Sequence, residues 1–221
     1  GEKRYAEFVA RWLAAVQQNL CPEFGMITHI AEPGSGRPLG PPRGTSQVII
    51  LRFLADIDPE FASAQYERFQ THFQSKLLGV PAILEYPRGT DGPSDVDSGP
   101  LIGGVSASAS VVGMGVAQLY GDHELSQAVS QFGEVLGFPY GNEKRRYLGG
   151  LLPIGDAFLV HATTARPWLR EPSEFTVHRT AVSTFWRTRI HLLSILAGVL
   201  FYLVWRLLGH VLLHRGSMSH G

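Results

Sequence analysis

The sequence predicts an all-α protein, built of repeated helical hairpins and followed by a C-terminal transmembrane helix. Long segments without charge alternate along the chain with amphipathic segments that begin at an acidic cap. Near the carboxyl end, a run of 24 residues reads IHLLSILAGVLFYLVWRLLGHVLL. We therefore expect four parts: a helical-hairpin domain over residues 1–168, a linker over 169–189, a transmembrane helix over 190–213 and a short tail over 214–221.

The composition excludes several classes of protein. The 221 residues hold 19 Lys and Arg against 19 Asp and Glu, and 44% are hydrophobic. A chain with this hydrophobic content is not disordered. Its net charge of zero gives no indication of the basic face that a nucleic-acid-binding protein needs. The single cysteine, Cys21, excludes an internal disulfide and a cysteine-based zinc site. No histidine shows a ligand spacing such as HExxH, and there is no P-loop or GxGxxG loop, so we predict no metal and no cofactor.

The first predicted helix covers residues 3–20. Its apolar residues recur at helical spacing and form one stripe: Tyr5, Phe8, Val9, Trp12, Leu13, Val16 and Leu20. The chain begins with Gly rather than Met, and this helix starts almost at once. We therefore expect the helical domain to be incomplete at its N-terminus.

The first hairpin is predicted between residues 44 and 73. Gly44–Ala55 is short and almost wholly apolar, which leaves a buried helix and a buried strand both open. Asp58 and Pro59 then read as an N-cap and a first helical residue. The helix that follows carries an apolar stripe of Ala62, Tyr66, Phe69 and Phe73.

The same pattern returns further along the chain. Residues 101–120 are apolar or small, and Gly121–Asp122 read as a turn and a cap. An amphipathic helix follows, with the stripe Leu125, Ala128, Val129, Phe132, Val135 and Leu136. A third apolar segment starts near Tyr147 and runs to about Ala165. Hairpins of this kind stack because one alone cannot bury its apolar face.

Residues 101–120 also admit a second interpretation, since 20 uncharged residues are long enough to cross a bilayer. The segment holds four glycines together with Ser106, Ser108 and Ser110. Small residues at this density favour a helix packed against its neighbours inside the protein. We therefore predict a buried inner helix and keep the membrane span as the alternative.

Residues 190–213 are predicted to anchor the chain in a lipid bilayer as a single span. The uninterrupted apolar part is shorter than the roughly 20 residues that a bilayer core requires, so Arg206 has to extend toward the interface. A buried or membrane-surface helix is the alternative. Arg179, Arg187 and Arg189 precede the span and only Arg215 follows it, which predicts that the helical domain faces the cytoplasm.

A loop rich in charge precedes the second inner helix. It contains Glu85-Tyr86-Pro87-Arg88-Gly89 and then Ser94-Asp95-Val96-Asp97-Ser98-Gly99-Pro100. Uncharged inner helices that alternate with amphipathic outer ones, joined by such Gly/Pro-rich loops, resemble the (α/α) toroids of the six-hairpin glycosidases. This resemblance covers roughly residues 1–168 and is architectural. It implies that the loop lies at the mouth of a pocket for a sugar or another small polar molecule.

Three carboxylates of this loop are the catalytic candidates: Glu85, Asp95 and Asp97. In an extended segment, Asp95 and Asp97 would point to opposite faces, so each pairs better with Glu85 than with the other. A carboxylate pair supplies a general acid together with a base or nucleophile. The alternative is that residues 97–100 form a turn that caps the inner helix.

Four further residues are predicted to bind the substrate: Tyr86, Arg88, Arg43 and Asp156. Arg88 would orient a carboxylate or bind one on the substrate. The tripeptide Arg43-Gly44-Thr45 repeats the sequence of Arg88-Gly89-Thr90. Either it is a remnant of the repeat, or it forms a second rim of the same pocket mouth. Asp156 either caps the last inner helix or joins the acidic pocket. Two functions stay open: a membrane-anchored hydrolase or lyase, and a non-catalytic membrane protein whose helical domain is a binding or assembly module.

Overall fold

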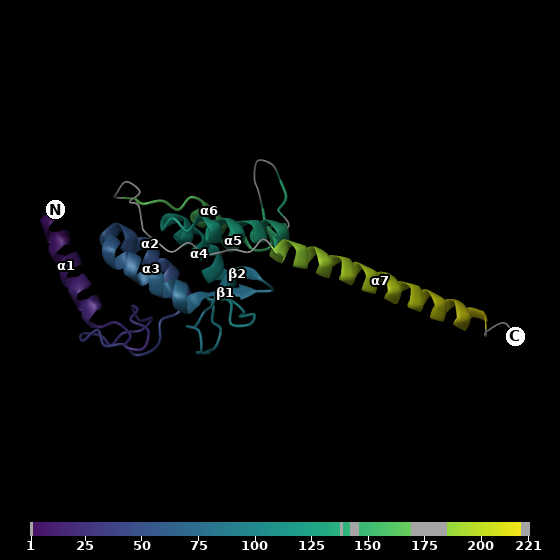
Figure 1. Ribbon diagram of the computed structural model, residues 1–221, viewed down its shortest axis with the longest axis horizontal. Coiled ribbons are helices and arrows are strands. Elements are labelled where there is room, and N and C mark those ends of the chain that lie inside the picture. Colours follow the sequence, from purple (N-terminus) through teal and green to yellow (C-terminus); the bar gives the residue numbers. More distant parts are fainter. Residues whose placement is uncertain (1, 138, 142–145, 169–184, 218–221) are drawn as a thin grey trace. The chain divides into compact units, whose positions relative to one another are not determined.

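The computed structural model describes residues 2–137, 139–141, 146–168 and 185–217 (Figure 1). The chain divides into two compact units, Gly1–Val182 and Ser183–Gly221. Most of the predicted linker, residues 169–184, and the end of the predicted tail, residues 218–221, lie outside the described residues.

The first unit is mostly helical, as predicted, with one short hairpin of two strands. Its elements in chain order are α1 (Glu2–Gln18), α2 (Gly44–Ile57), α3 (Pro59–Phe73), β1 (Gln74–Leu77), β2 (Val80–Ile83), α4 (Ala107–Leu119), α5 (His123–Leu136), the 3₁₀ turn η1 (Leu148–Gly150) and α6 (Pro153–Thr163). The described residues show this helical unit and do not show a toroid.

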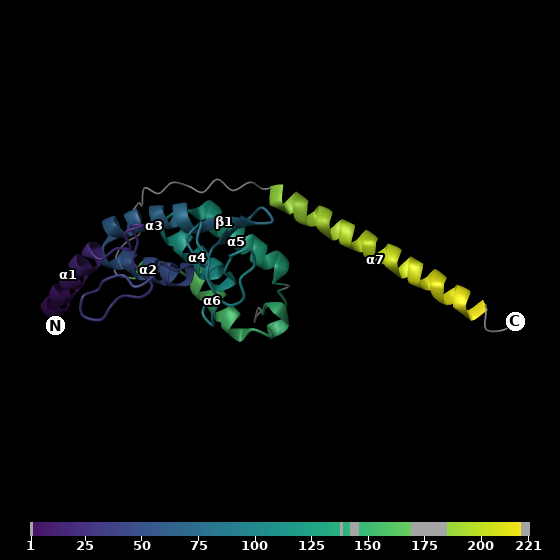
Figure 2. The ribbon, with the colours of Figure 1, turned by 90° about the horizontal axis from the view of Figure 1, so that it is seen from below.

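The helices pack in pairs. Helix α3 packs against α2, and α5 packs against α4, so each predicted amphipathic helix lies beside the apolar one that precedes it (Figures 1 and 2). Helix α4 also contacts both α2 and α6. Helix α4 is thus central among α2, α4 and α6. The third apolar segment is not a buried inner helix, because Ile154, Phe158 and Val160 of α6 are exposed and only Ala162 is buried.

The ambiguous segment Gly44–Ala55 is helical. It forms most of α2, which ends where the side chain of Asp58 caps α3 by accepting a hydrogen bond from the Phe61 amide at 3.0 Å. Asp122 caps α5 in the same way, through the Leu125 amide at 3.4 Å. Both predicted caps are therefore confirmed.

The membrane-span alternative for residues 101–120 is wrong. Helix α4 begins only at Ala107, where the Ser106 hydroxyl accepts from the Ala109 amide at 3.2 Å. Its 13 residues span roughly 20 Å, which is too short for a bilayer core. Both helical glycines serve close packing: a Cβ on Gly113 would lie 2.1 Å from Ile83 Cδ1, and one on Gly115 would lie 2.7 Å from Ala162 Cα.

The hairpin β1–β2 was not predicted. Its two-residue turn is Leu78–Gly79, with φ of 53° and 88°, and the strands pair from Leu77–Val80 to Gln74–Ile83. Two consecutive positive φ angles favour Asn-Gly or Asp-Gly. Because Leu stands in the first position here, the sequence carries little signal for this turn.

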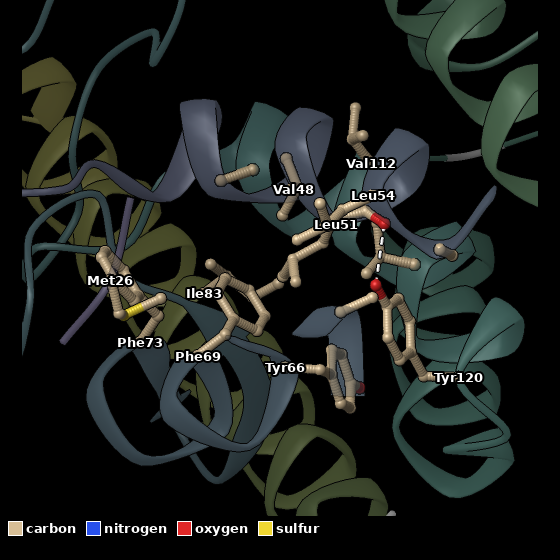
Figure 3. Close-up of a cluster of buried hydrophobic side chains, with 14 of the residues drawn as sticks. Met26, Val48, Leu51, Leu54, Tyr66, Phe69, Phe73, Ile83, Val112 and Tyr120 are labelled. Carbon is tan, nitrogen blue, oxygen red and sulfur yellow. Dashed lines mark hydrogen bonds between the residues drawn. The ribbon is translucent and has the colours of Figure 1, made fainter. Parts of the chain in front are cut away.

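The main core lies where α2, α3 and α4 meet (Figure 3). Tyr66 of α3 and Tyr120 stack with centroids 4.4 Å apart and planes 8° from parallel. The Tyr120 hydroxyl donates to the Leu51 carbonyl at 2.9 Å, and the Tyr66 hydroxyl donates to Asp122 at 3.3 Å. Burial raises the pKa of both tyrosines, so both hydroxyls stay protonated as donors.

Helix α1 is confirmed, but its predicted stripe is only partly covered. Leu13 packs against the main core. Tyr5 and Phe8 are 71% and 61% exposed, and Trp12 is 37% exposed.

The second unit is one long helix, α7 (Phe185–Ser217), which extends beyond the predicted span at both ends. Its stretch Thr188–Leu208 has 21 residues and a mean hydropathy of 1.9, and none of its residues is buried. Length and composition are thus sufficient to span a membrane.

Candidate functional site

Residues far apart in the sequence meet where α2 begins and β2 ends. The Gly44 amide donates to the Glu85 carbonyl at 2.7 Å. A Cβ on Gly44 would lie 2.1 Å from the Leu84 carbonyl oxygen, so only glycine allows this approach. The contact holds Arg43, just before α2, beside Glu85, just after β2. We call Arg43, Glu85, Asp95 and Tyr86 the Arg43 cluster.

Arg43 binds both neighbouring carboxylates of this cluster. Its Nε donates to Glu85 Oε1 at 2.8 Å, and its Nη2 lies 2.8 Å from the same oxygen. Its Nη1 donates to Asp95 Oδ2. The Arg43 side chain is 12% exposed and that of Glu85 is fully buried, so solvent screens this pair only weakly. The Asp95 side chain is 40% exposed, so its pair with Arg43 is screened more strongly.

Glu85 is fully buried. Its Oε1 also accepts from the Thr45 hydroxyl at 2.8 Å. Its Oε2 has no hydrogen-bond partner among the described residues. A buried carboxylate oxygen without a donor is uncommon and costly, which makes this atom notable.

Asp95 closes a turn of the loop. Its Oδ1 accepts from the amides of Asp97 and Ser98 at 3.1 Å and 2.9 Å, which is an Asx turn. The hydrogen bond from Arg43, and secondarily those of Ser98, hold the pKa of Asp95 well below its ordinary value. The carboxylate therefore stays ionised across the physiological pH range.

Tyr86 covers Arg43 with its ring. The guanidinium carbon lies 5.3 Å from the ring centroid, within the range of a cation–π contact. The Tyr86 hydroxyl donates to the Pro93 carbonyl at 2.8 Å. A Cβ on Gly92 would lie 2.3 Å from Tyr86 Cζ, so glycine is required for the loop to fold over this ring.

Arg88 lies apart from the Arg43 cluster. Its Nη2 donates to the Gln74 carbonyl at the start of β1, and its amide donates to the His72 carbonyl at 2.8 Å. It lines a surface pocket of about 540 Å³, which we call the Lys76 pocket; the lining residues are Gln70, Gln74, Ser75, Lys76, Pro81, Arg88 and Leu125. Two cations and no carboxylate line this part of the described chain, so the pocket suits an anionic group.

Asp97 and Asp156 do not join the Arg43 cluster. Asp97 is exposed, and Ser106, not residues 97–100, caps α4. Asp156 lies in the first turn of α6, where its Oδ1 accepts from the Tyr147 amide at 3.0 Å and its Oδ2 is 3.6 Å from Arg146. Its contacts are thus to the segment that leads into its own helix.

Sequence reasoning missed two residues of these sites, Thr45 and Lys76, and one buried ion pair elsewhere, that of Arg52. Thr45 belongs to the repeated Arg-Gly-Thr tripeptide, which was the available signal for it. Lys76 belongs to the β1–β2 hairpin, which was not predicted. Arg52 lies outside both sites: this buried arginine of α2 pairs with Asp56 at 3.1 Å, and its guanidinium lies 4.4 Å from the ring of Trp168. Two charges four residues apart in an otherwise apolar segment were the available signal.

Comparisons of the chain with protein-family models, curated proteins and solved structures found no match.

Proposed function

We propose that this chain is a membrane-anchored binding module, held in the bilayer by α7, whose helical unit binds a small anionic molecule in the Lys76 pocket. The observation that carries the anchor is the 21-residue apolar stretch of α7, none of which is buried within the chain. An exposed apolar surface of this extent requires a partner, and lipid fits its length.

The Lys76 pocket supports the binding role. Its volume lies within the range of small-molecule sites. Lys76 is exposed on β1, while the guanidinium of Arg88 is fixed by its bond to the Gln74 carbonyl. A flexible ammonium and a fixed guanidinium are a common pair for a carboxylate or phosphate. The amides of Gln70 and Gln74 add neutral hydrogen-bonding groups suited to a polar or saccharide body.

Binding is tested with the full chain in lipid nanodiscs. Glucuronate, inorganic phosphate and neutral glucose are titrated while the melting temperature is followed, because a ligand of the native state raises it. We expect stabilisation by one or both anions and none by glucose. Lys76→Gln should weaken binding about tenfold, whereas Arg37→Gln, which removes an exposed cation outside the pocket, should not. Equal responses of all three solutes, or of both variants, would refute the pocket.

The anchor is tested by alkaline extraction of membranes. The chain should stay in the pellet, and two arginines introduced by Leu196→Arg and Val199→Arg should release it, because charge at the centre of a span is costly. Leu196→Ala with Val199→Ala is the matched control. Release of the unmodified chain would mean that α7 is not a span.

A hydrolase or lyase is the second candidate. Two observations favour it. The carboxylates of Glu85 and Asp95 both bind the guanidinium of Arg43, so they lie close together. A substrate hydroxyl could donate a hydrogen bond to Glu85 Oε2, which has no partner among the described residues. We rank it second because Asp95 is held ionised and cannot act as a general acid. Asp95→Asn that abolishes a hydrolytic activity in a protein that circular dichroism shows to be folded would reverse this order.

A further inference from the structure

We propose that α1 contacts the surface of an anionic lipid bilayer through Tyr5, Phe8 and Trp12, which we call the aromatic face. This inference rests on the anchoring part of the proposed function and goes beyond it, because it concerns a different helix and a different mode of membrane contact.

The aromatic face lies on one side of α1. Tyr5, Phe8 and Trp12 are spaced three and four residues apart, which places them on one side of a helix. Leu13 lies on another side and packs against the core. The helix is thus attached through one edge of its apolar stripe and leaves the aromatic edge exposed.

Charge borders the aromatic face. Arg4 and Arg11 stand four residues before and three residues after Phe8, so both flank it, and both are exposed. Glu7 lies between them on the helix surface and is exposed as well. The pattern of large aromatic side chains bordered by arginines is that of helices that lie in the plane of a membrane interface. Arginine attracts anionic headgroups, while tyrosine and tryptophan favour the headgroup level.

The chain itself makes this contact favourable. A helix that binds lipid weakly on its own gains a high effective concentration when the same chain carries a span. Helix α7 is that span in the proposed function. Modest affinity of α1 is therefore sufficient, and three exposed aromatic side chains with two arginines provide it.

Neighbouring alanines of α1 give a matched test. Ala15 lies three residues from Trp12, on the aromatic side, whereas Ala14 lies on the opposite side, and both are exposed. Each is replaced by cysteine in a Cys21→Ala background and labelled with a fluorophore that reports polarity. The full chain is reconstituted into vesicles of phosphatidylcholine with phosphatidylglycerol, some of whose lipids carry a nitroxide quencher.

We expect the Ala15→Cys label to shift its emission to the blue and to lose most of it to the quencher, while the Ala14→Cys label keeps most of its emission. Arg4→Glu with Arg11→Glu, or vesicles of phosphatidylcholine alone, should reduce quenching at Ala15 several-fold. Circular dichroism confirms that each variant is folded. Flotation with the vesicles reports α7 separately, so failure of the anchor is distinguishable from failure of this proposal.

Three outcomes would overturn the inference. An Ala15→Cys label without a blue shift shows that the aromatic face stays in water. Equal quenching of both labels shows that the helix does not lie with one face on the bilayer. A blue shift that grows with protein concentration but is insensitive to the lipid quencher shows that a second copy of the chain covers the face.

Discussion

Arg43 and Glu85 form a buried ion pair between the residue before α2 and the second residue after β2. The Arg43 Nε lies 2.8 Å from Glu85 Oε1, across 42 positions of sequence. Because Glu85 is fully buried, its charge depends on Arg43 and on the Thr45 hydroxyl for compensation. The same guanidinium reaches Asp95, so one residue holds helix, strand end and loop together.

Arg43→Ala should lower the free energy of unfolding by about 3 kcal/mol, because it leaves the Glu85 carboxylate buried without its cation. Arg37→Ala is the control: it breaks the exposed pair with Glu32 and should cost less than about 1 kcal/mol. Chemical denaturation of both variants measures the difference. Equal losses would show that the Arg43 cluster does not stabilise the fold.

The lowered pKa of Asp95 predicts that this residue contributes to stability in a pH-dependent way. Its pKa is lowered in the folded state, so its ionised form stabilises the fold at any pH above the unfolded pKa of about 3.9. That contribution is lost as the pH falls below this value toward the folded pKa. The melting-temperature advantage of the native chain over Asp95→Asn should therefore be constant near neutral pH and shrink below about pH 4. A melting-temperature difference that stays constant down to about pH 3 would contradict this prediction.

Two glycines should respond to alanine in opposite directions. Gly115→Ala places a methyl group 2.7 Å from the α6 backbone at Ala162 and should destabilise the protein by about 1–3 kcal/mol. Gly133→Ala adds its methyl group in open space on α5 and should stabilise by about 0.5–1 kcal/mol. Thermal unfolding distinguishes them. A neutral Gly115→Ala would contradict the close contact of α4 with α6.

Leu78→Asn should stabilise the hairpin turn. Leu78 has a φ of 53°, a conformation that costs a leucine about 1 kcal/mol and that asparagine adopts more readily. Its side chain is 63% exposed, so little packing is lost. The expected gain is up to about 1 kcal/mol of unfolding free energy. Leu39→Asn, at another exposed leucine without a positive φ, should give no gain.

The flanking arginines predict the orientation of the proposed span: the tail after it, residues 214–221, should face outside. A cysteine at Ser217, in a Cys21→Ala background, should react with an impermeant thiol reagent on intact cells. Labelling only after permeabilisation would place the tail in the cytoplasm and the helical unit outside. Such a result would also favour an extracytoplasmic saccharide ligand.

The sequence alone determined the elements whose signals are local. The caps Asp58 and Asp122 each bond an amide three residues away, so their effect is visible in a short window of sequence. The apolar stripe of α3 also follows from local spacing, and its four members are buried as predicted. The length and composition of α7 required no tertiary information, because the feature is a continuous run of side chains.

The tertiary structure alone decided which distant residues meet. Four of the seven predicted site residues converge: Arg43, Glu85, Asp95 and Tyr86. Arg88 lines a separate pocket, Asp156 contacts the segment before its own helix, and Asp97 is exposed. Arg43-Gly44-Thr45 and Arg88-Gly89-Thr90 look alike in sequence, yet their arginines have different partners. The difference arises because Gly44 packs against the backbone after β2, whereas Gly89 has a φ of 88° in an open loop. Ion pairs across 42 and 52 positions depend on how the chain packs, and no local pattern encodes them.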